Sequence, residues 1–325
     1  MSARLRTAHQ FHPVLAYGDA VSNDAFELQR LFWASDVRSD LFAWEAKPEV
    51  RALVRDWRDL ERLPKDALLL IHHSMGNDVL GELAALPQRK AIVYHNITPG
   101  SYFAGLNEHA RRYSDLGREQ LRELAQVAEL GIADSEFNRQ ELEAAGLAKT
   151  AVVPILYDWE AFDVTPDPVV TRALADERTA ILVVGQILPQ KAVHDVIAAF
   201  ARYRQGDRGA RLYLVGSTAM SASYLDRLTR QVEDAGLADD VIFTGSVNVE
   251  QLVAYYRGAT ALLTLSDHEG FCVPLIEAMR SRLPIVANAA GAIPETLGDA
   301  GILLDDKTPH TVAAALERVV RDQDL

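Results

Sequence analysis

Two glutamates, Glu269 and Glu277, stand at either end of a strand-to-helix joint in the stretch DHEGFCVPLIEAM, residues 267–279. Seven residues separate them, and an apolar, strand-like run precedes them. Pro274 suits the first turn of a helix, where its missing N–H group costs no hydrogen bond. We therefore expect a helix to begin near Cys272–Pro274. Glu269 then lies in the loop before the helix, and Glu277 lies in its first turn or two.

A joint of this kind has the chemistry to bind a nucleotide. The N–H groups at the start of the helix would bind the phosphates, and the carboxylates would accept hydrogen bonds from vicinal hydroxyl groups. The structural alternative is that Glu277 complements the helix dipole and Glu269 is a surface loop residue. A glycosidase with the two glutamates as acid and nucleophile is a further alternative, which the buried-looking helix around Glu277 disfavours.

A second strand–turn–helix segment is VVGQILPQK, residues 183–191. Gly185 would let the backbone approach a ligand, and Lys191 would stand at the start of the following helix, where helix N–H groups and an ammonium group suit a phosphate. Gly216 ends another strand-like run in the same way. Each segment is also compatible with an ordinary turn carrying a solvated lysine. Neither matches the G-x-G-x-x-G or Walker pattern, which disfavours dinucleotide-binding and P-loop enzymes.

Three histidines raise the question of a metal site. His72 and His73 are adjacent, and His95 follows a later apolar run. Adjacent residues of a strand point to opposite faces, so both histidines could bind one ion only at the end of the strand. No carboxylate stands at an obvious ligand spacing. We expect no metal site, and we interpret residues 72–78 as a loop that contacts an acceptor.

Apolar strand-like runs alternate with helical ones along most of the chain, which indicates parallel strands covered on both faces. With 325 residues the chain is long enough for two α/β domains. We predict an N-terminal domain at 1–157, a linker at 158–178 that is rich in acidic residues and proline, and a C-terminal domain at 179–325. Ligands bind at the carboxyl ends of such strands. The strand-like runs are 67–73, 90–96, 130–135 and 150–156, then 180–185, 211–216, 240–245, 260–266, 284–289 and 301–306.

Composition narrows the class of protein. The chain is 49% hydrophobic and 24% charged, as in an ordinary globular protein. Its formal charge of −13 argues against general binding of nucleic acid. The single cysteine excludes an intrachain disulfide, and no apolar run approaches the length of a membrane span. We expect a cytoplasmic protein and leave open a peripheral contact with the inner face of the membrane.

Residues 266–306 resemble the donor-binding block of retaining GT-B glycosyltransferases of family 4. The shared features are the glutamate–seven residues–glutamate motif, the strand-like Pro284–Asn288, the small-residue turn at Gly291 and the segment Ile293-Pro294-Glu295. Weaker resemblance covers most of the remaining chain, at 184–200, 243–259, 93–105 and 133–142.

The resemblance implies two Rossmann-like, doubly wound parallel-sheet domains that face each other across a cleft. It also implies metal-independent, retaining transfer of a hexose from a nucleotide diphosphate sugar, such as GDP-mannose or a UDP-hexose. The acceptor would be a hydroxyl group of a glycan or a lipid-linked glycan. The nucleotide sugar is then a substrate, and no cofactor is expected.

Carried over position by position, the resemblance implies a role for each site residue. Glu277 would accept hydrogen bonds from the ribose, Glu269 would contact the donor sugar, and Lys191 would bind the diphosphate. His95 would face the reacting sugar. The remaining positions expected at the nucleotide sugar are Gly18, Gly185, Gln186, Gly216, Gly270, Phe271, Cys272 and Val273.

The sequence departs from the family pattern in several places. Gln186 stands where the family usually has an arginine beside the diphosphate, and Ala192 replaces a glycine. The family commonly continues past Leu325 with a helix that crosses back onto the first domain, so the chain is either a truncated form or a short member. Two other functions remain open: a nucleotide-sugar epimerase on the same scaffold, and a noncatalytic protein that binds sugar nucleotides.

Overall fold

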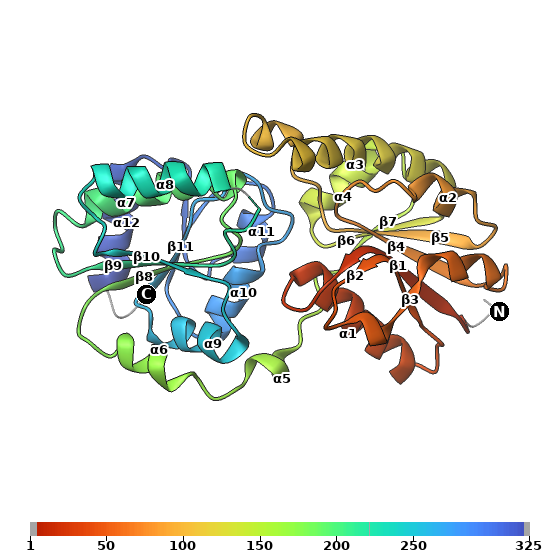
Figure 1. The fold of residues 1–325 in the computed structure, drawn as a ribbon, viewed down its shortest axis with the longest axis horizontal. Helices are drawn as coiled ribbons and strands as arrows, with labels where there is room; N and C mark the ends of the chain where they lie inside the picture. Colours follow the sequence, from red (N-terminus) through yellow and green to blue (C-terminus); the bar gives the residue numbers. More distant parts are fainter. Residues whose placement is uncertain (1–4, 221, 322–325) are drawn as a thin grey trace. The chain divides into compact units, whose positions relative to one another are not determined.

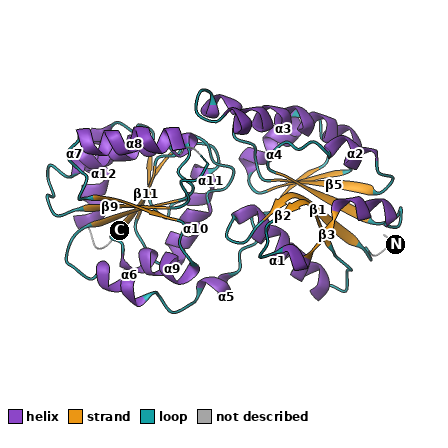
Figure 2. Cartoon of the chain, in the orientation of Figure 1, coloured by secondary structure: helices purple, strands orange, loops and turns teal. Residues whose placement is uncertain are grey.

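The computed structural model describes residues 5–220 and 222–321 (Figure 1). The chain divides into two compact units. The first comprises the chain up to Ser101 together with His109–Asp158, and the second comprises Tyr102–Glu108 together with the chain from Trp159 onward. Each unit contains one sheet of parallel strands flanked by helices (Figure 2).

The first unit is built on a seven-stranded sheet in the order β3-β2-β1-β4-β5-β6-β7, with parallel neighbours throughout. The order reverses between β1 and β4, so the loops after these two strands diverge and leave a place for a ligand. The strands are β1 (Ala8–Leu15), β2 (Leu41–Ala46), β3 (Val54–Asp56), β4 (Leu68–His73), β5 (Arg89–Tyr94), β6 (Leu130–Ala133) and β7 (Thr150–Val152).

Helices cover both faces of this sheet. In Figure 1, α2, α3 and α4 lie above it and α1 lies below. Phe11, Phe42, Ile71 and Tyr94 are fully buried in the core between sheet and helices. The helices are α1 (Ala20–Ala34), α2 (Leu80–Ala85), α3 (Glu108–Val127) and α4 (Glu136–Ala144), with 3-10 turns η1 (Arg51–Leu53), η2 (Trp57–Arg62) and η3 (Gly100–Phe103).

The second unit has a six-stranded parallel sheet in the order β10-β9-β8-β11-β12-β13. Here the order reverses between β8 and β11, which defines the corresponding switch point of this sheet. The strands are β8 (Ala180–Val184), β9 (Arg211–Val215), β10 (Val241–Gly245), β11 (Ala261–Thr264), β12 (Ile285–Asn288) and β13 (Ile302–Leu304).

The largest core cluster of the second unit lies where α7, α8 and α12 pack on the sheet, with Phe200, Leu214 and Leu316 at its centre. All but the first residue of the expected linker at 158–178 lies within this unit, and this segment carries two short helices that contact α9. The helices are α5 (Trp159–Phe162), α6 (Pro168–Ala173), α7 (Val193–Tyr203), α8 (Ala222–Asp234), α9 (Val249–Gly258), α10 (Val273–Arg280), α11 (Ile293–Leu297) and α12 (Pro309–Arg321), with the 3-10 turn η4 (Pro189–Lys191).

The predicted fold class, α/β with two Rossmann-like parallel sheets, is confirmed. All ten predicted strand-like runs correspond to strands, β4 to β13. The sequence analysis missed β1, β2 and β3. The strand β1 (AHQFHPVL) lies at the centre of its sheet yet contains His9, Gln10, His12 and Pro13, so it lacks the continuous apolar run by which the other strands were recognised.

Candidate functional site

The switch point of the second sheet brings together two of the predicted site residues. Lys191 ends η4 in the connection after β8, and Glu269 lies in the connection after β11, the neighbouring strand. The ammonium Nζ of Lys191 lies 2.6 Å from Oε1 of Glu269. Their side chains are 23% and 10% exposed. The pair is therefore largely shielded from water, and the carboxylate of Glu269 balances the ammonium charge of Lys191.

The environment keeps Lys191 charged. Burial by itself would lower the pKa of Lys191, but the Glu269 carboxylate outweighs it, and the net pKa is raised above the ordinary value. The Ser266 hydroxyl donates a second hydrogen bond to Oε1 of Glu269, at 2.8 Å. Asn288, at the end of β12, donates in turn to the carbonyl of Ser266. The loop that carries Glu269 is thus held by side chains from its own and the next strand.

Glycines line the ends of β8 and β9 because the backbones approach each other closely there. A Cβ atom on Gly216 would lie 1.9 Å from the carbonyl oxygen of Gly185, and Gly216 has φ +150°. Gly185 has φ +143°, and a Cβ there would stand 3.7 Å from Cε of Lys191. A side chain at Gly185 would fill the space beside the lysine, and one at Gly216 would collide with the backbone of Gly185. The glycines therefore allow the ends of β8 and β9 to lie close together.

The helix α10 begins at Val273, as the position of Pro274 predicts, and Cys272 is its N-cap residue with φ 72°. Burial, followed by the nearby Glu269 carboxylate, raises the pKa of the Cys272 thiol well above its ordinary value. The carbonyl of Phe271 accepts a hydrogen bond from the Thr296 hydroxyl of α11 at 2.6 Å. This contact fixes the loop before the helix from outside it.

Glu277 lies inside α10 and is 5% exposed. Its Oε2 accepts a hydrogen bond of 2.6 Å from the hydroxyl of Tyr256 in α9. Tyr256 is itself fully buried. The structure therefore holds this carboxylate in a defined position from a neighbouring helix.

Gly291 fixes the other side of the Glu269 loop. It has φ +55°, and a Cβ atom there would lie 2.3 Å from the carbonyl oxygen of Glu269. The same carbonyl accepts a hydrogen bond from the N–H of Ala292 at 3.0 Å. The small-residue turn after β12 is therefore packed directly on the backbone of the loop that carries the glutamate.

The other expected positions differ in their surroundings. Gln186, which stands in place of the family's arginine, is exposed. Lys307 pairs with Asp195 at 2.7 Å and also with Asp267, so its charge is already compensated within the unit. In the first unit, Gly18 has φ +87° and precedes Asp19, the N-cap residue of α1.

His95 directly follows β5, the strand next to β4 and so one strand away from the switch point of the first sheet, and its side chain is 1% exposed. Its Nδ1 lies 2.9 Å from the Asp134 carboxylate, and its Nε2 lies 2.8 Å from Nδ1 of His72. Burial by itself would lower the pKa of His95, but the carboxylates of Asp134 and Asp24 reverse this, and the net pKa is raised. Both ring nitrogens have hydrogen-bond partners within the unit.

The structure also shows partners that the sequence analysis missed. Four side chains contact predicted site residues: Tyr256 contacts Glu277, Ser266 contacts Glu269, and Asp24 and Asp134 contact His95. Only Ser266 is close to its partner in the sequence. Asp134 carried the clearest signal, because it directly follows an apolar run. Its position at the end of β6, beside β5, could have placed it near His95.

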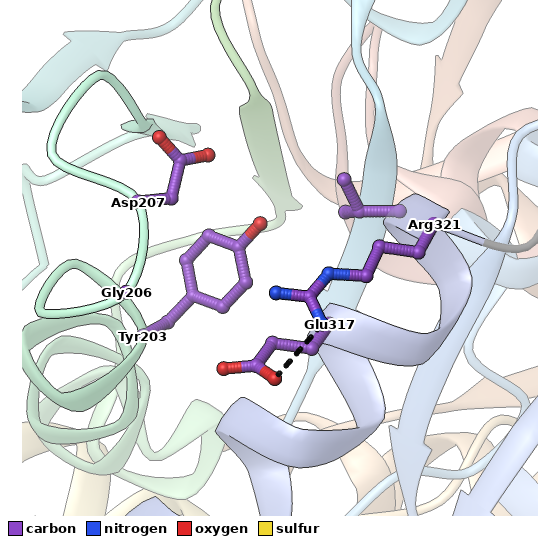
Figure 3. Close-up of a pocket in the computed structure, with 6 residues that line it drawn as sticks. Tyr203, Gly206, Asp207, Glu317 and Arg321 are labelled. Carbon is purple, nitrogen blue, oxygen red and sulfur yellow. Dashed lines mark ion pairs between the residues drawn. The ribbon is translucent and has the colours of Figure 1, made fainter.

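A small pocket of about 230 Å³ lies elsewhere in the second unit (Figure 3). It lies where α7 and α12 end, close to the start of β9. Lys191 instead follows the carboxyl end of β8, at the opposite ends of the strands. It is therefore separate from the predicted site. Its lining residues are Tyr203, Gly206, Asp207, Glu317, Val320 and Arg321.

Comparison with known proteins identifies the class. Residues 171–325, most of the second unit, match the family model "Glycosyl transferases group 1". The family resemblance stated from the sequence is thereby confirmed. The match includes Lys191, Glu269 and Glu277.

Curated relatives are more distant. The chain is 26% identical, over 225 residues, to a GDP-mannose-dependent alpha-(1-6)-phosphatidylinositol monomannoside mannosyltransferase of Mycobacterium tuberculosis, covering 64% of this chain and 57% of the relative. It is 28% identical over 219 residues to a D-inositol 3-phosphate glycosyltransferase of Geodermatophilus obscurus, covering 65% of this chain and 49% of the relative. The chain thus spans about half the length of the curated relatives it matches.

Solved structures share the fold along nearly the whole chain. HepE of Anabaena, in complex with UDP-glucose, aligns with a TM-score of 0.76 at 17% identity and covers 97% of this chain and 90% of its own. The sucrose-phosphate synthase of Thermosynechococcus elongatus aligns with a TM-score of 0.72 at 17% identity, covering 98% and 90%. The chain therefore has the GT-B type of fold. Among the described residues, no helix combines the length and apolar character that crossing a membrane requires.

Proposed function

We propose that this protein is a retaining glycosyltransferase. It transfers a hexose from a nucleotide diphosphate sugar, GDP-mannose or a UDP-hexose, to a hydroxyl group of a glycan or lipid-linked acceptor. The observation that carries the proposal is the shielded Lys191–Glu269 pair at the switch point of a group 1 glycosyltransferase domain. The curated mannosyltransferase relative and the UDP-glucose complex of a protein with the same fold support the choice of donor class.

In the proposed reaction the bond between the sugar's anomeric carbon and the diphosphate oxygen breaks. The acceptor oxygen forms the new bond to the same face of the sugar, and its proton passes to the departing phosphate oxygen. Negative charge builds up on the diphosphate, so a fixed cation is the main means of lowering the barrier. Lys191, whose pKa is raised, supplies that cation at neutral pH. A diphosphate would bind beside the ammonium group that Glu269 now holds.

Glu269 would direct its carboxylate to the hydroxyl groups of the sugar. Ser266, Asn288 and Gly291 hold the loop that carries it in position. Glu277 would accept hydrogen bonds from the ribose, held in place by Tyr256. The backbone of Gly270–Val273, at the start of α10, would lie nearest the phosphates. Since Gln186 carries no charge, stabilisation of the leaving group rests on Lys191 more than it would with the family's arginine.

Further parts of the sequence-based prediction belong to this proposal. Transfer needs no metal ion at the diphosphate and no cofactor. The protein does not bind nucleic acid, and it works in the cytoplasm with a peripheral contact to the inner membrane face. His95 would face the reacting sugar, with its ring oriented by the carboxylate of Asp134.

The test is a screen of thermal stability against UDP, GDP and ADP sugars, followed by nucleotide release from the best donor with and without candidate acceptors. We expect Glu277→Ala to weaken nucleotide binding and Lys191→Ala to slow transfer by at least about 100-fold, the loss typical of one transition-state donor. Lys65→Ala, at an exposed lysine of the first unit, is the control and should behave as wild type.

The outcomes separate the alternatives. Conversion of a nucleotide sugar without acceptor and without nucleotide release indicates an epimerase. Binding without turnover under any acceptor indicates a noncatalytic protein. Indifference to every nucleotide sugar overturns the proposal altogether.

A further inference from the structure

The second unit contains two lysines, Lys191 and Lys307, and the fold brings both to the carboxyl ends of its strands. Lys191 follows β8 and pairs with Glu269. Lys307 lies between β13 and α12, and the proposed reaction gives it no role. Its side chain is 27% exposed. An ammonium group at these strand ends raises the question of which groups it holds in place.

Lys307 bridges two acidic side chains that come from different connections of the sheet. Its Nζ lies 2.7 Å from Oδ2 of Asp195, in the first turn of α7. The same nitrogen donates a hydrogen bond to Oδ1 of Asp267, two residues before Glu269. The side chains of Asp195 and Asp267 are 31% and 32% exposed. One cation therefore links the helix that follows Lys191 to the loop that carries Glu269.

The charges of this group depend on one another. Burial by itself would lower the pKa of Lys307, but hydrogen bonds with Asp195 and Asp267 outweigh it, and the net pKa is raised. Both carboxylates lie close to the same nitrogen, so without the ammonium group two like charges would be left to repel each other. The repulsion would displace the partner that is free to move.

Two of the three partners belong to elements that are fixed in the fold. The carboxylate of Asp306 accepts hydrogen bonds from the N–H of Thr308 at 2.9 Å and from the hydroxyl of Thr311 at 2.9 Å, which fixes the start of α12. Helices α7 and α12 pack against each other in the largest core cluster of the unit. Lys307 and Asp195 therefore keep their positions relative to each other.

Asp267 is the partner that lies in a loop. Its N–H donates a hydrogen bond of 2.8 Å to the carbonyl of Gln190, the residue before Lys191, while its side chain is held by Lys307. Two residues later, the Glu269 carboxylate meets the ammonium group of Lys191. Displacement of Asp267 would therefore carry the glutamate away from the lysine.

We propose that Lys307 is a positioning residue of the candidate site, which holds Asp267 against α7 and thereby sets the place of the Glu269 carboxylate beside Lys191. The proposal rests on the proposed function, in which Glu269 contacts the donor sugar and Lys191 binds the diphosphate. Lys307 itself contacts neither part of the donor. Its effect is therefore on the rate of transfer more than on the affinity for nucleotide.

Four variants of the full chain separate positioning from stability. Lys307→Met keeps the apolar stem and removes the charge, whereas Lys307→Arg keeps a cation that can bind both carboxylates. Asp267→Asn weakens the link from the loop side and leaves Lys307 paired with Asp195, so it serves if Lys307→Met does not fold. Arg204→Met is the matched control, because Arg204 and Asp240 form an ion pair of 2.8 Å with side chains 19% and 18% exposed. That pair lies after α7 and before β10, at the opposite ends of the strands.

The first measurement is nucleotide release from the donor that stabilises the protein most. We expect the kcat of Lys307→Met to fall about 10- to 100-fold, the cost of a displacement near 1 Å at a reacting group. The Kd of the bare nucleotide diphosphate should change much less, because the variant removes no group that binds it. Lys307→Arg should recover most of the wild-type kcat, and Arg204→Met should lower the Tm without lowering kcat.

The second measurement needs no substrate. Hydrogen exchange in the ligand-free protein is followed in the peptide that contains residues 266–271. The N–H of Asp267 should exchange about 10-fold faster in Lys307→Met than in wild type, because its bond to Gln190 opens more often. Arg204→Met should leave this exchange unchanged.

Unchanged exchange in Lys307→Met overturns the proposal, and so does a wild-type kcat in Lys307→Met or, where that variant does not fold, in Asp267→Asn. A wild type that turns over no nucleotide sugar overturns the proposed function instead. The exchange of the Asp267 N–H then still decides whether Lys307 holds the loop.

Discussion

The contact between Gly291 and the Glu269 loop allows a test of how closely this loop must be positioned. In Gly291→Ala the new Cβ would stand 2.3 Å from the carbonyl oxygen of Glu269, and such contacts are essentially never shorter than 3.0 Å. The carbonyl must therefore retreat by about 0.7 Å, which weakens its hydrogen bond with Ala292. A displacement near 1 Å at a reacting group can cost about 100-fold in rate. We expect kcat/KM to fall 10- to 100-fold.

Gly236→Ala is the matched control. Gly236 has φ +66°, close to the +55° of Gly291, but no atom lies within 4 Å of the position that its Cβ would take. Both variants pay a backbone cost of about 1–2 kcal/mol for an alanine in the left-handed region. Only Gly291→Ala displaces the glutamate loop.

The assay is nucleotide release from the donor that stabilises the protein most, together with the Kd of the bare nucleotide diphosphate and the Tm of each variant. Gly236→Ala should lower the Tm by a few degrees and keep the wild-type rate. Gly291→Ala should lose rate while its affinity for the bare nucleotide changes less, because in the proposed function Glu269 contacts the sugar. Equal rates in the two variants would refute the argument that this loop positions a reacting group.

Three other outcomes follow from the structure. Burial lowers the pKa of His73 to about 4, so neutral His73 stabilises the fold fully above pH 6.5, and this stability is lost as the pH falls from 6.5 through 4. The loss amounts to about 2 kcal/mol at pH 5. The Tm of His73→Gln should therefore fall less than that of wild type between pH 7 and pH 5. An equal fall of Tm in the two proteins contradicts this. Tyr256→Phe removes the buried hydrogen bond to Glu277 and should lower the free energy of unfolding, measured with denaturant, by about 1–3 kcal/mol. It should also weaken nucleotide binding. Wild-type affinity for the nucleotide would argue against Glu277 as a ribose ligand. Gly216→Ala places a Cβ 1.9 Å from the carbonyl oxygen of Gly185 and should separate the ends of β8 and β9. Calorimetry should then show a loss of diphosphate binding. Full binding would show that the two strand ends are not part of the site.

The alternation of apolar runs and helical segments was enough to predict the fold class, because a strand buried on both faces needs a continuous stretch of Val, Ile and Leu. It predicted β4 to β13 correctly and failed for β1, which carries four polar or proline residues. His12 of this strand lies beside His72 at the switch point. The polar residues of β1 interrupt the apolar run by which a buried strand is predicted, and they are the same residues that place this strand in a polar cluster.

The arrangement of the candidate site in the second unit was accessible from the sequence because its parts are local. Pro274 indicated the start of α10, and the positions of Glu269 and Glu277 relative to that start followed from the spacing. The glycine-ended strands predicted an approach of the backbone to a ligand, and in the folded chain Gly185 and Gly216 allow the two strand ends to lie close together. These are properties of single strand–turn–helix units, which fold according to neighbouring residues.

Only the tertiary structure decided which side chains meet. Lys191 and Glu269 are 78 positions apart, and they form a pair because β8 and β11 are neighbours in the sheet, an order that composition does not specify. The same holds for His72 and His95, which the sequence analysis considered for a metal without a carboxylate in reach. Asp24 comes to within 4.0 Å of His95 from a helix that follows an unrecognised strand. Sheet order results from packing the whole domain, and so the partners of each charged group become visible only in the folded chain.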